Sequence, residues 1–135
     1  MPHFVEIKVA VLLNAYRKDQ SGPSSRSCFS EIFRRVNPSI HLDFFDTVKA
    51  QQYPNLGDKY DAIVLSGSAA DINVPAPWID KLMAFLRRVS QDYPKTKIVG
   101  ICWGHQACVK AFGGQIHEIP DGPEVSTHCN IRTAH

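Results

Sequence analysis

The sequence lacks a membrane-length apolar run, a block of like charges and a regular pattern of cysteines. A transmembrane helix needs about 20 consecutive apolar residues, and no stretch of this chain approaches that length. With 15 Lys and Arg against 13 Asp and Glu, the chain shows no basic run of the kind that binds nucleic acid or anionic membranes. We therefore expect neither a nucleic-acid nor a membrane partner.

Signals for secretion are also missing. The N-terminus, Met1 to Glu6, has neither the charged region nor the apolar region of a signal peptide. The four cysteines are irregularly spaced in a chain of this size, which does not indicate a disulfide framework. We therefore expect a reducing, cytoplasmic location, in which a cysteine can stay reactive.

Metal-ligand spacings are absent too. His105, His117, His128, Cys129 and His135 could suggest a metal site, but no C-x-x-C or H-x-x-x-H pair occurs. The spacings match no common zinc pattern. We expect no metal and no cofactor.

What the sequence does contain is an alternation of strand and helix patterns. The 135 residues suffice for a single domain, 1–135, with one core. Strands alternating with helices indicate an α/β fold, with an open, mostly parallel sheet and helices on both faces. The expected strands are 7–13, 40–48, 60–65, 98–101 and 115–119; the expected helices carry apolar stripes at Phe29, Ile32, Phe33 and Val36, at Ile79, Leu82, Met83, Leu86 and Val89, and at 107–112.

The most informative segment is Gly100-Ile101-Cys102-Trp103-Gly104-His105-Gln106. The array Gly100-x-Cys102-x-Gly104, between a strand and a helix, is the cysteine form of a nucleophile elbow. Glycines suit a tight turn in which a β-carbon would clash with neighbouring backbone. The turn would place Cys102 at a helix N-terminus, which favours a thiolate. Cys28, Cys108 and Cys129 lack such glycines, and we expect each to act as a small buried hydrophobe.

A second segment ends at the same sheet edge, where ligands of parallel sheets bind. Ser66-Gly67-Ser68 follows the strand at 60–65 and could bring a backbone N–H toward the Cys102 sulfur. With the Trp103 N–H it would form an oxyanion hole, which stabilises a tetrahedral acyl intermediate. Alone, the segment would be an ordinary turn; beside the elbow, it favours the oxyanion hole.

These residues resemble a known family. The elbow heptapeptide resembles the nucleophile motif of class I glutamine amidotransferases, and Tyr60 to Ser68 resembles their preceding strand and oxyanion loop. The likeness is closest to the stand-alone branch that includes γ-glutamyl peptidases, and it implies a flavodoxin-like fold. Supporting similarities occur at Trp78-Ile79, Gly113-Gly114 and Gly122-Pro123-Glu124-Val125.

The resemblance implies roles for individual residues. Cys102 would be the nucleophile that attacks a γ-glutamyl amide carbon, and Gly67 and Trp103 would be the backbone oxyanion donors. Gln106 would contact the substrate, a glutamine or γ-glutamyl compound of a small-molecule biosynthetic pathway. His105 matches the motif but is not the family's general base.

One part of the family pattern is missing. The family's catalytic histidine and glutamate lie in a later Phe-His-Pro-Glu-like motif, which does not occur here. None of His117, His128 and His135 has a carboxylate two residues on, and the tail 127–135 diverges from the family. Three hypotheses follow. The protein is a hydrolase or transferase whose acid–base group is unidentified, with a protein partner as one source of it; or it is a non-catalytic relic that binds a ligand or partner; or it is a C-terminally truncated gene product.

Overall fold

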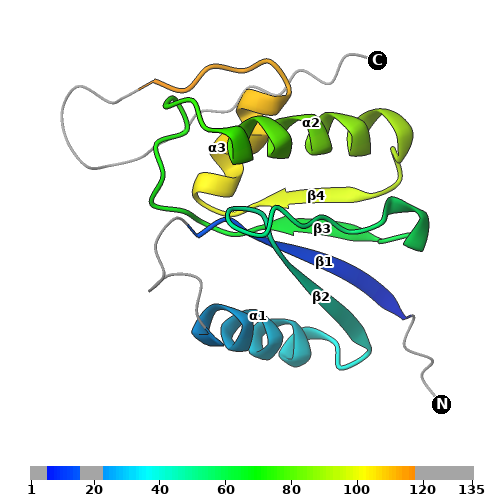
Figure 1. The fold of residues 1–135 in the computed structure, drawn as a ribbon. Helices are drawn as coiled ribbons and strands as arrows, with labels where there is room; N and C mark the ends of the chain where they lie inside the picture. The colour runs from blue at the N-terminus through cyan, green and yellow to red at the C-terminus, as the bar shows by residue number, and fades with distance from the viewer. Residues whose placement is uncertain (1–5, 16–22, 118–135) are drawn as a thin grey trace.

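The computed structural model describes residues 6–15 and 23–117. Four strands form one sheet in the order β2-β1-β3-β4, and every neighbouring pair is parallel. Helix α1 lies on one face of this sheet, and helices α2 and α3 lie on the other (Figure 1). The elements are β1 (Ile7–Leu13), α1 (Pro23–Val36), β2 (Ile40–Asp46), the short 3₁₀ helix η1 (Leu56–Asp58), β3 (Ala62–Leu65), α2 (Pro77–Asp92), β4 (Lys97–Gly100) and α3 (Trp103–Ala111).

This arrangement confirms the predicted fold class, a parallel α/β sheet with helices on both faces. Because all four strands run the same way, their carboxyl ends meet at one edge. Ser66 follows β3 at that edge, and Cys102 follows β4 two residues after its end. The register pairs Leu65 of β3 with Gly100 of β4, so the Ser66 to Ser68 loop and the elbow leave the sheet side by side.

The face beneath α2 and α3, which we call the α2 face, holds the larger core. Alternate strand residues point into it, as the pleat of a strand requires: Ala10 and Leu12 from β1, Ile63 and Leu65 from β3. Helix α2 contributes the predicted stripe, since Ile79, Leu82, Met83, Leu86 and Val89 are all buried. A helix with one apolar stripe is stabilised by burying it against a sheet.

The opposite face, beneath α1, is called the α1 face and is less completely covered. Val9, Val11, Leu13 and Val64 are buried there, with Phe29 and Phe33 of α1 packed against them. The predicted four-residue stripe of this helix was only half right. Ile32 is 52% exposed and Val36 is 77% exposed, because the sheet contacts a narrower band of the helix than the sequence pattern offers.

Three further expectations need correction. Cys28 is exposed on α1 rather than buried, whereas Cys108 is buried as expected; Cys129 lies outside the described residues.

Strand β2 ends at Asp46, not at residue 48. The Asp46 carboxylate accepts hydrogen bonds from the backbone N–H groups of Val48, Lys49 and Ala50, and these bonds turn the chain away from the sheet.

The fifth predicted strand, 115–119, is not observed in its described part. Gly113 takes a φ of 86°, and the Gly114 N–H closes the end of α3 on the Val109 carbonyl at 2.8 Å. Gln115 to His117 then leave the helix without joining the sheet. A short apolar run is a weak strand signal unless a neighbouring strand accepts its hydrogen bonds. Within the described ranges, no helix has the length and apolar character needed to cross a membrane.

Candidate active site

The turn between β4 and α3 has the geometry of a nucleophile elbow. Cys102 is the N-cap of α3 and takes φ 55° and ψ −114°, a conformation that costs an L-residue other than glycine free energy. The residue is exposed. Strain of this kind persists only where the surrounding structure holds it in place, and here two glycines permit the turn.

Both elbow glycines are required by close backbone approach. A β-carbon on Gly100 would lie 2.5 Å from the Gly104 carbonyl oxygen, and one on Gly104 would lie 2.6 Å from the Leu65 carbonyl oxygen. Atoms of the main chain cannot move aside as the end of a long side chain can. The spacing Gly100-x-Cys102-x-Gly104 therefore has a steric cause in this structure.

The Ser66 to Ser68 loop lies directly beside the nucleophile candidate. The Ile101 N–H donates to the Leu65 carbonyl at 3.0 Å, which extends the β3–β4 ladder up to the elbow. A β-carbon on Gly67 would lie 3.7 Å from the Cys102 Cβ, so Gly67 lies close beside the cysteine, with room for little more than a methyl group between them. Among the described residues, no group accepts a hydrogen bond from the backbone N–H of Gly67 or of Trp103. Both donors are thus free for a ligand.

The Trp103 side chain anchors the elbow rather than lining it. Its ring is 2% exposed and packs against Trp78 of α2, with centroids 5.2 Å apart and planes inclined by 31°. Among the described residues, the indole N–H finds no hydrogen-bond acceptor. Trp103 therefore ties the start of α3 to α2 through its ring, while its backbone N–H stays at the turn.

His105 and Gln106 occupy the first turn of α3. Their backbone N–H groups donate to the Cys102 carbonyl at 2.9 and 3.3 Å, and both residues are partly exposed. Within the described chain, no side chain hydrogen-bonds to the Cys102 sulfur. The structure therefore brings together Cys102, Gly67 and Trp103, but no acid–base group joins them. His128 and His135 lie outside the described residues, as do the predicted tail 127–135 and Gly122 to Val125.

A set of polar residues at the same edge was not predicted from the sequence. Asn14, Thr47 and Ser66 are buried, and hydrogen bonds join Asn14 to each of the other two. Each follows the carboxyl end of a different strand, β1, β2 and β3. The available signal was a polar residue directly after each apolar strand, but Thr47 fell inside the strand predicted for 40–48.

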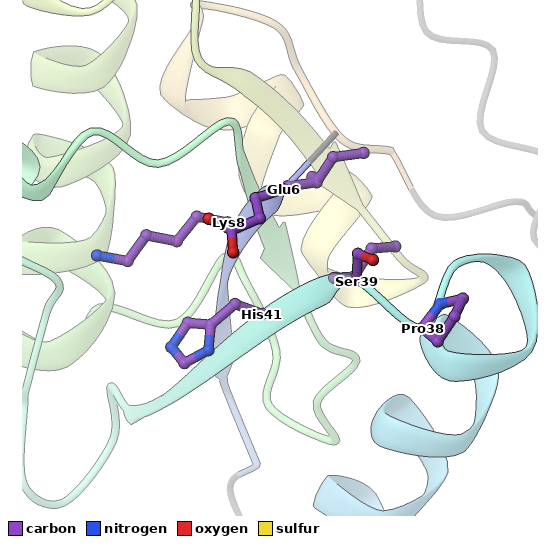
Figure 2. A pocket seen from close by; sticks show the side chains of 7 residues that line it. Glu6, Lys8, Pro38, Ser39 and His41 are labelled. Atoms are coloured by element: carbon purple, nitrogen blue, oxygen red, sulfur yellow. The ribbon is translucent and has the colours of Figure 1, made fainter. Parts of the chain in front are cut away.

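Two hollows in the surface differ in their position relative to Cys102. The hollow in Figure 2, about 450 Å³, lies between the amino ends of β1 and β2 and is lined by residues including Lys8, Ser39 and His41. It is at the opposite edge of the sheet from Cys102 and so is not the candidate active site. A second hollow, of about 320 Å³, is lined by Ala69 to Asp71 and by Val74 to Ile79 except Pro77. This one adjoins the Ser66 to Ser68 loop in sequence.

The described residues contain no cluster of three or more His, Cys, Asp or Glu that could hold a metal ion. The chemistry available at this edge is that of a thiol and backbone donors. Such a set can form an acyl–sulfur bond and stabilise the negative charge that develops on a carbonyl oxygen.

Comparison with known proteins identifies similar chains. Among solved structures, a glutamine amidotransferase from Methylobacillus flagellatus superposes with a TM-score of 0.60 at 21% identity, covering 87% of this chain and 43% of that one. A glutamine amidotransferase from Thermotoga maritima gives 0.57 at 20% identity, covering 82% and 44%. These likenesses show the fold, which is flavodoxin-like.

Two relatives found by sequence have higher identities to this chain. The glutamine amidotransferase-like protein chyE of Penicillium rubens is 39% identical over 127 residues, which is 93% of this chain and 52% of that protein. Gamma-glutamyl peptidase 3 of Arabidopsis thaliana is 36% identical over 85 residues, 62% of this chain and 33% of that protein. The chain thus spans about half the length of the first relative and a third of the second. The family model for class I glutamine amidotransferases matches residues 28–134, and the chain belongs to that family.

Proposed function

We propose that the chain supplies the nucleophile half of a site that hydrolyses or transfers the γ-glutamyl group of glutamine or a γ-glutamyl compound. The observation that carries this proposal is the strained, exposed Cys102 with Gly67 close beside it. Family membership and the similarity to a γ-glutamyl peptidase support the substrate class.

In the first step, the Cys102 thiolate attacks the γ-carbonyl carbon, because the thiolate is the nucleophilic form of cysteine. A carbon–sulfur bond forms, and the carbonyl π pair moves onto the oxygen. The backbone N–H groups of Gly67 and Trp103, which have no acceptor in the described chain, donate to this oxyanion. Gln106, on the first turn of α3, contacts the substrate.

Collapse of the oxyanion restores the carbonyl, breaks the carbon–nitrogen bond and releases the amine, which needs a proton. Water then attacks the thioester and yields the γ-carboxylic acid and the free thiol. Both steps call for a general acid–base, and no side chain in the described residues hydrogen-bonds to the Cys102 sulfur. We propose that this group comes from outside the described residues or from a partner protein.

The test measures release of p-nitroaniline from γ-glutamyl p-nitroanilide, together with mass spectrometry of the acyl–enzyme. We expect the acyl group on Cys102, with turnover slowed by about 10²–10⁴-fold relative to a site with a complete acid–base pair. Cys102→Ala abolishes both signals. Cys28→Ala is the matched control, since Cys28 is also exposed but lies on α1; it leaves both signals unchanged. Folded wild-type protein that is neither acylated nor active would refute the proposal.

A further inference from the structure

Three polar residues lie buried at the carboxyl edge of the sheet, where the Ser66 to Ser68 loop begins, and we call them the edge cluster: Asn14, Thr47 and Ser66. Their exposed fractions are 0%, 0% and 8%. They come from the carboxyl ends of β1, β2 and β3, so the parallel sheet brings together residues that are 33 and 52 positions apart. Burying polar groups costs free energy unless hydrogen bonds replace those made to water.

The hydrogen bonds of the edge cluster form a chain that ends at Gly67. The Thr47 hydroxyl lies 2.5 Å from the Asn14 side-chain oxygen and 3.1 Å from the Leu13 carbonyl oxygen. The Asn14 backbone N–H donates to the Ser66 hydroxyl oxygen at 2.9 Å. That hydroxyl donates in turn to the Gly67 carbonyl at 3.1 Å.

A further bond acts on the peptide unit that carries the Gly67 N–H. The Asn14 side-chain NH₂ donates to the Ser66 carbonyl oxygen at 3.3 Å. This carbonyl and the Gly67 N–H belong to the same planar peptide, in which they point in opposite directions. Holding the Ser66 oxygen therefore sets the direction of the Gly67 N–H. With the Ser66 hydroxyl on the Gly67 carbonyl, both peptides that flank Gly67 are held from behind.

Gly67 needs such support because glycine has no side chain that could pack against its surroundings and hold the backbone. Glycine reaches backbone conformations that other residues rarely adopt, so a glycine peptide can rotate unless its carbonyls are fixed. The Gly67 N–H has no acceptor in the described part of the chain, and so no hydrogen bond on that side holds the peptide in place. Pre-organised donors are effective in catalysis because they do not have to reorient as charge develops.

We propose that Asn14, Thr47 and Ser66 are positioning residues that hold the Gly67 N–H in the direction an oxyanion requires. This inference rests on the proposed function, since it assumes that Cys102 forms an acyl intermediate. Ser66 and Asn14 act directly on the two peptides, and Thr47 acts through Asn14 by holding its side-chain oxygen.

The test compares two reactions of Cys102. Acylation by p-nitrophenyl acetate passes through an oxyanion, and the p-nitrophenolate leaves without needing a proton, so no acid–base group is required. Alkylation by iodoacetamide displaces iodide at a saturated carbon and forms no oxyanion. The ratio of the two rates therefore reports the oxyanion donors separately from the exposure and reactivity of the thiol.

The variants are Ser66→Ala and Thr47→Val, with Thr47→Ser as the conservative variant that keeps the hydroxyl. Thr96→Val is the matched control: the Thr96 hydroxyl donates to the Tyr60 carbonyl at 3.0 Å, but it precedes β4 at the opposite edge of the sheet. Thermal unfolding checks that each variant folds. If Thr47→Val does not fold, Ser66→Ala carries the test.

We expect Ser66→Ala and Thr47→Val to lower the acylation rate by about 10-fold or more, toward the roughly 10²–10³-fold lost when an oxyanion donor is removed. The alkylation rate stays within about 2-fold, and Thr47→Ser and Thr96→Val keep the wild-type ratio. If the wild-type protein is acylated and both variants keep its ratio of acylation to alkylation, the positioning role is overturned and the proposed function stands. Equal losses of both rates in the variants would have the same consequence. A wild-type protein that is alkylated at Cys102 but not acylated would overturn both.

Discussion

On the α2 face of the sheet, two helices cover strands whose inward side chains are almost fully buried; on the α1 face, one helix leaves two of its own apolar side chains in solvent. The larger core contains 17 buried residues of the described chain, and the smaller contains four. The elbow helix α3 belongs to the larger core through Trp103, Ala107, Cys108 and Ala111. The strained turn therefore stands on the more completely packed face, where the surroundings can hold it.

The largest expected difference between the two faces comes from truncating an isoleucine to alanine on each of them. Ile79 of α2 is 3% exposed, whereas Ile32 of α1 is 52% exposed. We expect Ile79→Ala to lower the free energy of unfolding by about 2–5 kcal/mol, because it leaves a cavity in a packed core. Ile32→Ala should stay within about 0.5 kcal/mol of wild type. Urea denaturation measures both, and equal losses would show that the two faces do not differ.

A second test uses the point at which α3 touches the sheet. Gly104→Ala places a methyl group 2.6 Å from the Leu65 carbonyl oxygen, which should cost about 1–3 kcal/mol of stability and displace the elbow. Gly113, at the other end of α3, has open space around a β-carbon and a φ of 86°, so Gly113→Ala costs about 1–2 kcal/mol through its backbone alone.

The measurement that separates these two glycines is the alkylation rate of Cys102. We expect that rate to change in Gly104→Ala and to stay at the wild-type value in Gly113→Ala. A Gly104→Ala protein with wild-type stability and alkylation would contradict the close approach of α3 and β3.

The smallest expected effects come from two tyrosines on the α2 face. The Tyr60 hydroxyl donates to the Asp43 carboxylate at 2.8 Å, whereas the buried Tyr53 hydroxyl has no hydrogen-bond partner in the part of the chain that the structure describes. Tyr60→Phe should therefore lower the free energy of unfolding by about 1 kcal/mol, and Tyr53→Phe should raise it by up to about 1 kcal/mol. The same substitution thus changes the free energy of unfolding in opposite directions at the two positions. A change in the same direction at both positions would contradict this account.

The pH dependence gives a second readout of the same pair. Burial raises the pKa of Tyr53, and burial together with the neighbouring Asp43 carboxylate raises the pKa of Tyr60, both well above the usual value. Below pH about 10 both phenols are protonated in the folded and unfolded states, and their contribution to stability is complete. Above that pH the unfolded chain ionises first, so stability falls as pH rises. Each Tyr→Phe variant should reduce the slope of this alkaline loss, measured by denaturation at several pH values.

The parts of this molecule that could be predicted from the sequence are those set by nearby residues. The α2 stripe follows from helical spacing, and the elbow follows from two glycines around Cys102, which the Gly104 and Leu65 contacts explain. The edge cluster could not be predicted in the same way. The Asn14–Thr47 contact exists only because β1 and β2 pair in a particular register, and register is a property of the folded sheet.

The errors on the α1 face have a similar cause. Helical spacing placed Ile32 and Val36 on one side of α1, but how wide a band the sheet covers depends on how the two elements meet. Cys28 was expected to be buried from the general behaviour of cysteine, yet it lies on the exposed part of the helix. The type of a residue sets its tendency to be buried, and the way the helix packs on the sheet decides whether it is buried.

The parallel sheet also divides the loops of this chain into two kinds that protein engineers can treat differently. Asn14, Thr47, Ser66 and Cys102 all lie in connections that leave the carboxyl edge, whereas the turns at Pro38 and at Pro94 to Thr96 lie at the amino edge. Pro94 and Lys95 are exposed, and exposed turns of this sort accept inserted sequence most readily. A fluorescent or affinity module inserted between Pro94 and Lys95 would leave all four connections at the carboxyl edge uncut, and so would report on folding without interrupting the candidate site.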